Sequence, residues 1–142
     1  MIQLDITHAQ KFITAGELSA IGPQVATAAK LLESRTGPGN DFLGWLDLPL
    51  KYDRAEFRRI KASAKRIQKQ SEVLIVIGIG GSYLGAKAAI EFCQHGFYNN
   101  LPRKKRRLPE VYFAGTNISG TYLTQLLEVI GDRDFSVNVI SK

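Results

Sequence analysis

The sequence predicts an α/β protein with three layers, in which a parallel sheet lies between helices and a helical segment precedes it. Three runs of strand length occupy residues 73–77, 110–114 and 135–140, and a helical pattern separates each run from the next. Parallel neighbours need such crossovers, because the chain must return to the same end of the sheet before another strand begins. At 142 residues, the chain is long enough to bury one sizeable core.

The first half of the chain is predicted to be helical. Pro23 suits the first turn of a helix, where its missing N–H would have no partner anyway, and an apolar face at helical spacing follows from Val25. Asp53 predicts the start of a second helix, because its carboxylate can accept the first amide protons. Apolar side chains within residues 57–67 give that helix a core-facing stripe, and its lysines and arginines are expected to face solvent.

The second half alternates strands and helices. Residues 73–77 form a continuous β-branched and apolar run, which is typical of a strand covered on both faces, so we expect it at the centre of the sheet. A helix is predicted over residues 83–94, a strand over 110–114, a helix over 120–130 and a strand over 135–140. The strand order, with the first strand between the other two, would be flavodoxin-like.

The predicted organisation is a helical segment over residues 1–70 and the first part of an α/β domain over residues 71–142. Ser141 and Lys142 follow the last strand directly, with no helix to cover it. Since parallel sheets are normally covered on both faces, we interpret the domain as truncated and the chain as the front portion of a longer protein. A complete natural protein of 142 residues is the alternative.

The net charge of +6 depends on one short segment. Five of the 19 basic residues form the run Arg103–Arg107, and the rest of the chain holds 14 basic and 13 acidic residues. We interpret the run as an exposed, solvated loop. Nucleic-acid binding is the alternative, with an affinity that falls steeply with salt, but the run lacks the interleaved aromatic residues of single-strand binders.

The remaining composition predicts a soluble protein of a reducing compartment, the cytoplasm. Cys93 is the only cysteine, so no internal disulfide can form, and we expect it to be a small buried apolar residue. The longest apolar stretch is far shorter than the ~20 residues of a membrane helix. No histidine or cysteine cluster has the spacing of metal ligands.

The glycine-rich segment 78–85 joins the first strand to its helix and is the strongest local motif. A dinucleotide fingerprint would need glycine where the chain has Tyr83, and a Walker A loop would need lysine where it has Ala86. What remains is a glycine loop with a hydroxyl group, which suits a phosphate or a sugar rather than a nucleotide. A tight turn that permits close helix packing is the alternative.

Hydroxyl-rich loops follow all three predicted strands, at residues 80–82, 115–119 and 141–142. The carboxyl ends of parallel strands meet at one edge of the sheet, where ligands of such folds bind. Because these loops carry no carboxylate, they predict a pocket for an anionic polyol. Ser119 also fits the N-cap of the following helix, which we favour, and Thr116 and Asn117 could equally form the turn.

Four segments carry a resemblance to the bacterial type of glucose-6-phosphate isomerase: residues 41–49, 76–89, 115–123 and 134–142. The resemblance covers nearly the whole chain, and the conjunction of these segments is highly specific. The resemblance implies two sugar-isomerase (SIS) domains in the complete protein, each a five-stranded parallel sheet between helices. It also implies the interconversion of glucose 6-phosphate and fructose 6-phosphate through an enediol, in glycolysis and gluconeogenesis, without metal or organic cofactor.

The resemblance implies that Gly81 and Ser82 contact the sugar phosphate and that Ser141 and Lys142 begin the phosphate cradle. A β-branched residue at position 81 is expected to block backbone approach and to strain the turn. The family's motifs for its catalytic glutamate, histidine, arginine and lysine lie beyond residue 142. None of these catalytic residues can therefore be placed in this chain, and we expect the chain alone to be inactive.

The expected partner is a small-molecule sugar phosphate, with no nucleic acid and no membrane, and the resemblance implies a homodimer or higher homo-oligomer for the full-length protein. A non-catalytic SIS-type phosphosugar-binding module with a regulatory role is the alternative function.

Overall fold

The computed structural model describes residues 3–141, and these divide into two compact units, one up to Tyr52 and one from Asp53 onward. Each unit is described by itself. The second unit includes the helix before the sheet. The predicted domain boundary after residue 70 stays a prediction.

The first unit contains one long α-helix and two short 3-10 helices: α1 (Ala15–Ser34), η1 (Asn40–Phe42) and η2 (Gly44–Leu46). A capping box starts α1, because the Thr14 N–H donates to Glu17 Oε2 at 2.8 Å and the Glu17 N–H donates to Thr14 Oγ1 at 3.2 Å. The predicted start at Pro23 is wrong, since Pro23 lies inside this helix.

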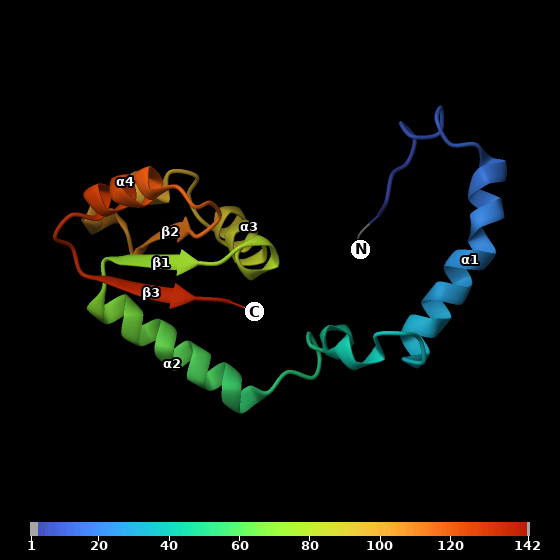
Figure 1. The fold of residues 1–142 in the computed structure, drawn as a ribbon, viewed down its shortest axis with the longest axis horizontal. Helices are drawn as coiled ribbons and strands as arrows, with labels where there is room; N and C mark the ends of the chain where they lie inside the picture. The colour runs from blue at the N-terminus through green and yellow to red at the C-terminus, as the bar shows by residue number, and fades with distance from the viewer. Residues whose placement is uncertain (1–2, 142) are drawn as a thin grey trace. The chain divides into compact units, whose positions relative to one another are not determined.

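The second unit is a parallel sheet between helices (Figure 1), as the sequence predicts. Its elements are α2 (Arg54–Gln70), β1 (Val73–Ile77), η3 (Gly80–Ser82), α3 (Leu84–Cys93), η4 (Tyr98–Asn100), η5 (Arg103–Lys105), β2 (Glu110–Ala114), α4 (Gly120–Ile130) and β3 (Phe135–Val139). The strand order is β2-β1-β3, so β1 is central, as predicted. It pairs along its whole length with both neighbours; for example, Ile75 lies opposite Tyr112 and Val137.

Two local signals act as predicted at the starts of helices. Asp53 Oδ1 accepts hydrogen bonds from the amides of Ala55 and Glu56, at 2.7 and 3.2 Å, and so caps α2. Ser119 Oγ accepts from the amide of Tyr122 at 3.2 Å and so caps α4. These short-range bonds place the beginnings of both helices.

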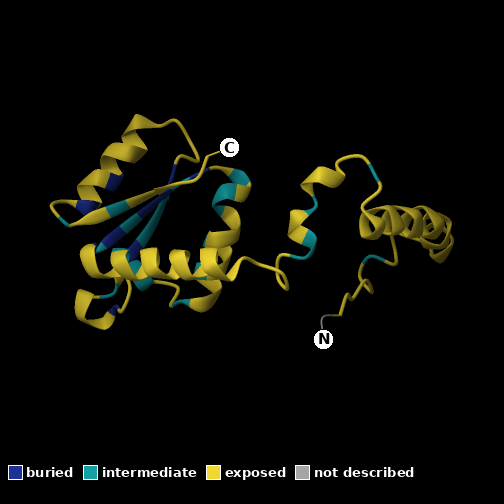
Figure 2. Cartoon of the chain, turned by 90° about the horizontal axis from the view of Figure 1, so that it is seen from below, coloured by how far each residue is buried: buried dark blue, intermediate teal, exposed yellow. Residues whose placement is uncertain are grey.

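The buried core lies between the sheet and α4. Val73 and Ile75 of β1 and Ala114 of β2 pack against Leu126 and Ile130 of α4. The opposite face of the sheet is covered by α2, and none of the residues of α2 is buried (Figure 2). None of the helices within residues 3–141 is long and apolar enough to cross a membrane.

Four residues of the basic run Arg103–Arg107 are exposed, as predicted, but Arg106 is buried, so the prediction of a solvated loop is wrong at that residue. The Arg106 side chain is 5% exposed and forms an ion pair with the equally buried Glu110. Arg133 Nη1 donates to the same carboxylate at 2.7 Å, and the Tyr112 hydroxyl donates to it at 2.8 Å. The Glu110 carboxylate therefore ties the loop before β2 to the segment after α4.

Cys93 is exposed in the last turn of α3, so the prediction of a buried cysteine is wrong. The apolar pattern located the helix but did not show which way its last residue faces.

We expect Glu110→Ala to lower the free energy of unfolding by about 3–5 kcal/mol, because it leaves the buried Arg106 guanidinium without its anion. Glu91→Ala is the matched control, since it removes one partner of the exposed Lys87–Glu91 pair and should cost no more than about 1 kcal/mol. Urea unfolding of both variants measures the difference. Equal effects would show that the Glu110 cluster does not hold the loop.

Candidate functional site

A cleft of about 790 Å³ lies at the carboxyl ends of the three strands. Parallel α/β proteins bind ligands at this edge. The loops after all three strands contribute to its lining: Ile77, Gly78, Ile79, Gly81, Ser82, Gly115, Val139, Ile140 and Ser141. The cleft thus brings together Gly81, Ser82 and Ser141, whereas Lys142 lies outside the described residues.

Backbone hydrogen bonds hold the three loops together at this edge. The Gly78 N–H donates to the Ala114 carbonyl at 3.2 Å, and the Ile140 N–H donates to the Ile77 carbonyl at 2.9 Å. Both bonds continue the pairing of the sheet beyond a strand end. The floor of the cleft is therefore an extension of the sheet rather than a set of independent loops.

Gly78 and Gly115 permit the close approach of the strand ends, a role that the sequence analysis did not assign to them. A Cβ atom on Gly115 would lie 2.9 Å from Ile77 Cγ2, and the φ of Gly115 is +81°. A Cβ atom on Gly78 would lie 3.0 Å from Ser82 Cβ and 3.3 Å from the Ile140 carbonyl oxygen. The available sequence signal was a glycine directly after each of the first two strands.

The turn between β1 and α3 owes its shape to Gly80, whose φ is +56°. The amides of Ser82 and Tyr83 donate to the carbonyls of Ile79 and Gly80, at 3.2 and 3.1 Å. Gly81 has no positive φ, and a Cβ atom there would meet nothing within 4 Å. The expectation that a larger residue at position 81 strains the turn is therefore wrong; such a side chain would enter the open cleft.

The hydroxyl groups of Ser82 and Ser141 are free to bind a ligand. Ser82 is half-buried and Ser141 is exposed, and both line the cleft. Neither side chain makes a hydrogen bond to another residue within the described range 3–141. By contrast, Asn117 Oδ1 accepts a hydrogen bond from the Ser119 backbone N–H at 2.9 Å. Asn117 therefore forms the turn, which is one of the two roles predicted for it.

The cleft is lined by apolar side chains, glycines and two serines, and none of the described residues that line it carries a charged side chain. No side chain caps the N-terminus of α3, which begins two residues after Ser82. The first amides of this helix are donors, and the helix end has a partial positive charge that favours an anion. No described group of His, Cys, Asp or Glu in residues 3–141 could hold a metal ion. This arrangement can bind and orient an anion.

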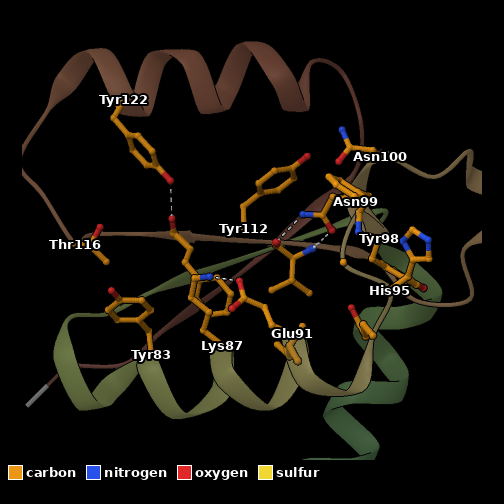
Figure 3. Close-up of a pocket in the computed structure, with 16 residues that line it drawn as sticks. Tyr83, Lys87, Glu91, His95, Tyr98, Asn99, Asn100, Tyr112, Thr116 and Tyr122 are labelled. Carbon is orange, nitrogen blue, oxygen red and sulfur yellow. Dashed lines mark hydrogen bonds and ion pairs between the residues drawn. The ribbon is translucent and has the colours of Figure 1, made fainter.

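A second cleft, of about 410 Å³, lies at the outer edge of β2 between α3 and α4 (Figure 3). Its polar groups mostly bond to the protein. In the side chain of Asn99, Nδ2 donates to the Val111 carbonyl at 2.8 Å and Oδ1 accepts from the Val111 N–H at 3.2 Å. The Tyr122 hydroxyl donates to the Phe113 carbonyl at 2.8 Å. These bonds protect the edge of β2 from pairing with another strand.

Lys87 and Glu91 form an ion pair within this second cleft (Figure 3). Burial, and then the hydrogen bond to Glu110, raise the pKa of Tyr112, which also lines it. Thr116, a candidate for the first cleft by its place in the sequence, lines the second one instead.

Comparison with known proteins gives a consistent set of relatives. The chain is 56% identical to the glucose-6-phosphate isomerase of Fusobacterium nucleatum, 57% to that of Enterococcus faecalis and 54% to that of Clostridium novyi. Each similarity covers 99% of this chain but only 31–32% of the relative. No protein-family model matches the chain.

The chain therefore spans about a third of the length of the curated relatives that it matches. Over almost all of its own residues it is similar to bacterial glucose-6-phosphate isomerases, as its motifs predicted.

Proposed function

We propose that the first cleft binds the phosphate of a sugar phosphate and that the protein functions as a glucose-6-phosphate isomerase. One observation carries this proposal: Ser141, which is far from Gly81 and Ser82 in the sequence, lines one cleft with them at the carboxyl edge of the sheet. The identity of 53–57% to such isomerases supports it, since the similarity includes all three strand-end loops.

The chemistry of the cleft suits the non-reacting end of the substrate. The Ser82 hydroxyl and the first amides of α3 are donors for phosphate oxygens. Ser141 adds a second hydroxyl, and Lys142 would supply a cation. Binding the phosphate fixes the sugar chain, so that its C1 and C2 carbons can be presented to a proton-transfer group elsewhere in the complete protein.

The isomerisation itself needs a group that moves a proton between C1 and C2. We propose that a glutamate outside this chain does so, while an arginine stabilises the developing charge of the enediol. Ring opening would be assisted by histidine and lysine. In this proposal the enzyme works in the cytoplasm, in glycolysis and gluconeogenesis, as a homodimer or higher homo-oligomer with SIS domains.

The second candidate function is a phosphosugar-binding module that regulates without catalysis. It is favoured by the lack of any carboxylate or imidazole group among the described residues of the cleft. The two candidates share the binding step and differ in whether the complete protein converts its ligand.

We expect Ser82→Ala to weaken the binding of fructose 6-phosphate to the chain by about 0.5–1.5 kcal/mol, the contribution of one hydrogen bond. Gly81→Val should weaken binding more strongly without lowering the free energy of unfolding, because its side chain enters the open cleft. Titration calorimetry measures affinity, and urea unfolding measures stability.

Thr116→Ala is the matched control, since this hydroxyl lines the second cleft. It should leave the affinity for fructose 6-phosphate unchanged. If Gly81→Val bound fructose 6-phosphate normally and Thr116→Ala bound it more weakly, the sugar phosphate would bind in the second cleft, which would contradict the proposal.

The chain alone is expected to have no isomerase activity. General acid–base catalysis contributes about 10²–10⁴-fold and requires its group to be present. An assay that couples glucose 6-phosphate formation to NADP⁺ reduction measures turnover, with a full-length bacterial glucose-6-phosphate isomerase as the positive control. Turnover by the chain at a rate near that of the control would contradict the proposal that the proton-transfer group lies outside this chain.

A further inference from the structure

A stripe of basic residues runs along the outer face of α2. Its members recur at intervals of three or four residues: Arg54, Arg58, Lys61, Lys65 and Lys69. At 3.6 residues per turn, these positions lie on one side of the helix, over a length of about 22 Å. All five residues are exposed, and none forms an ion pair with an acidic residue in the described range.

The stripe faces away from the sheet. Ile60, Ala64 and Ile67 of α2 line a groove together with Leu74 of β1, so the apolar side of the helix is directed inward. The basic side chains on the other side consequently point to solvent.

A second group of cations adjoins the end of α2. Arg103 Nε lies 3.6 Å from Oε2 of Glu72, a residue just after that helix. Figure 2 shows the segment between α3 and β2 next to the end of α2. Within this segment Lys104, Lys105 and Arg107 are exposed and form no ion pair with a described residue. The buried Arg106 anchors the segment to the fold.

We propose that this α2–loop surface, made of the five stripe residues with Lys104, Lys105 and Arg107, binds the phosphodiester backbone of a nucleic acid without reading its sequence. Intervals of three or four residues along a helix place cations every 4.5–6 Å, so the stripe offers a continuous row of positive charges to a polyanion. Backbone phosphates are bound through lysine and arginine alone. The missing aromatic residues therefore exclude base stacking but not this kind of contact.

A nucleic acid fits this surface better than a membrane does. Helices that lie on a membrane bury their apolar face among the lipids, whereas the apolar face of α2 is turned toward the sheet. The loop part of this surface adjoins the amino ends of the strands, because Arg103 pairs with Glu72 just before β1, whereas the first cleft lies at their carboxyl ends. The inference thus revises the expectation of no nucleic-acid partner and does not depend on the proposed isomerase function.

Fluorescence anisotropy with a labelled 20-base-pair DNA duplex tests the proposal on the 142-residue chain. Between 50 and 200 mM salt, the plot of log K against log salt concentration should have a slope of about −4 to −7, as expected when roughly five to eight phosphates are neutralised. Lys61→Glu with Lys65→Glu should weaken binding at least about tenfold at 50 mM salt.

Lys11→Glu with Lys30→Glu is the matched control, because it changes the net charge equally in the other unit. This control should bind the duplex nearly as well as the unchanged chain, and circular dichroism should show that both double variants are folded. If both double variants lost the same affinity for the duplex, net charge alone would explain the loss, and the proposal would be overturned. Absence of duplex binding at 50 mM salt, or binding only to phosphatidylserine vesicles, would also overturn it.

Discussion

The pairing of β1 on both of its edges is the constraint on which the rest of the second unit depends. Because β1 lies between β2 and β3 in parallel register, all three strands end at the same level. Ile77 is level with Ala114 on one side and Val139 on the other. The loops after the strands must therefore meet, and a cleft at that edge follows from the topology.

How closely the loops meet is decided by two glycines. Any side chain at Gly115 would collide with Ile77, and a side chain at Gly78 would press on Ser82. The residues that shape the cleft are thus distinct from those proposed to bind the ligand. Gly81, unlike Gly78 and Gly115, could carry a Cβ atom with no other atom within 4 Å of it.

The parts of the fold that could be predicted from the sequence depend on local signals. The apolar run of β1 gave the strand its bounds and its central position, and Asp53 and Ser119 cap helices through residues two or three positions away. The start of α1 had an equally local signal in Thr14 and Glu17, which the presence of Pro23 obscured.

The parts that could not be predicted depend on contacts between distant segments. The burial of Arg106 requires Glu110 as its ion-pair partner. Glu110 also pairs with Arg133, which lies in the segment after α4. The loop sequence alone shows five consecutive cations and gives no sign of which one turns inward. The roles of Gly78 and Gly115 likewise follow from the distance between strand ends, which no local pattern contains.

The most direct test of this account is the change in backbone amide chemical shifts when fructose 6-phosphate is titrated into the isotopically labelled chain. The account predicts the largest changes at Gly81, Ser82 and Ser141, which line the cleft where the three strand ends meet. Changes concentrated instead at Glu91 and Thr116, around the second cleft, would contradict it.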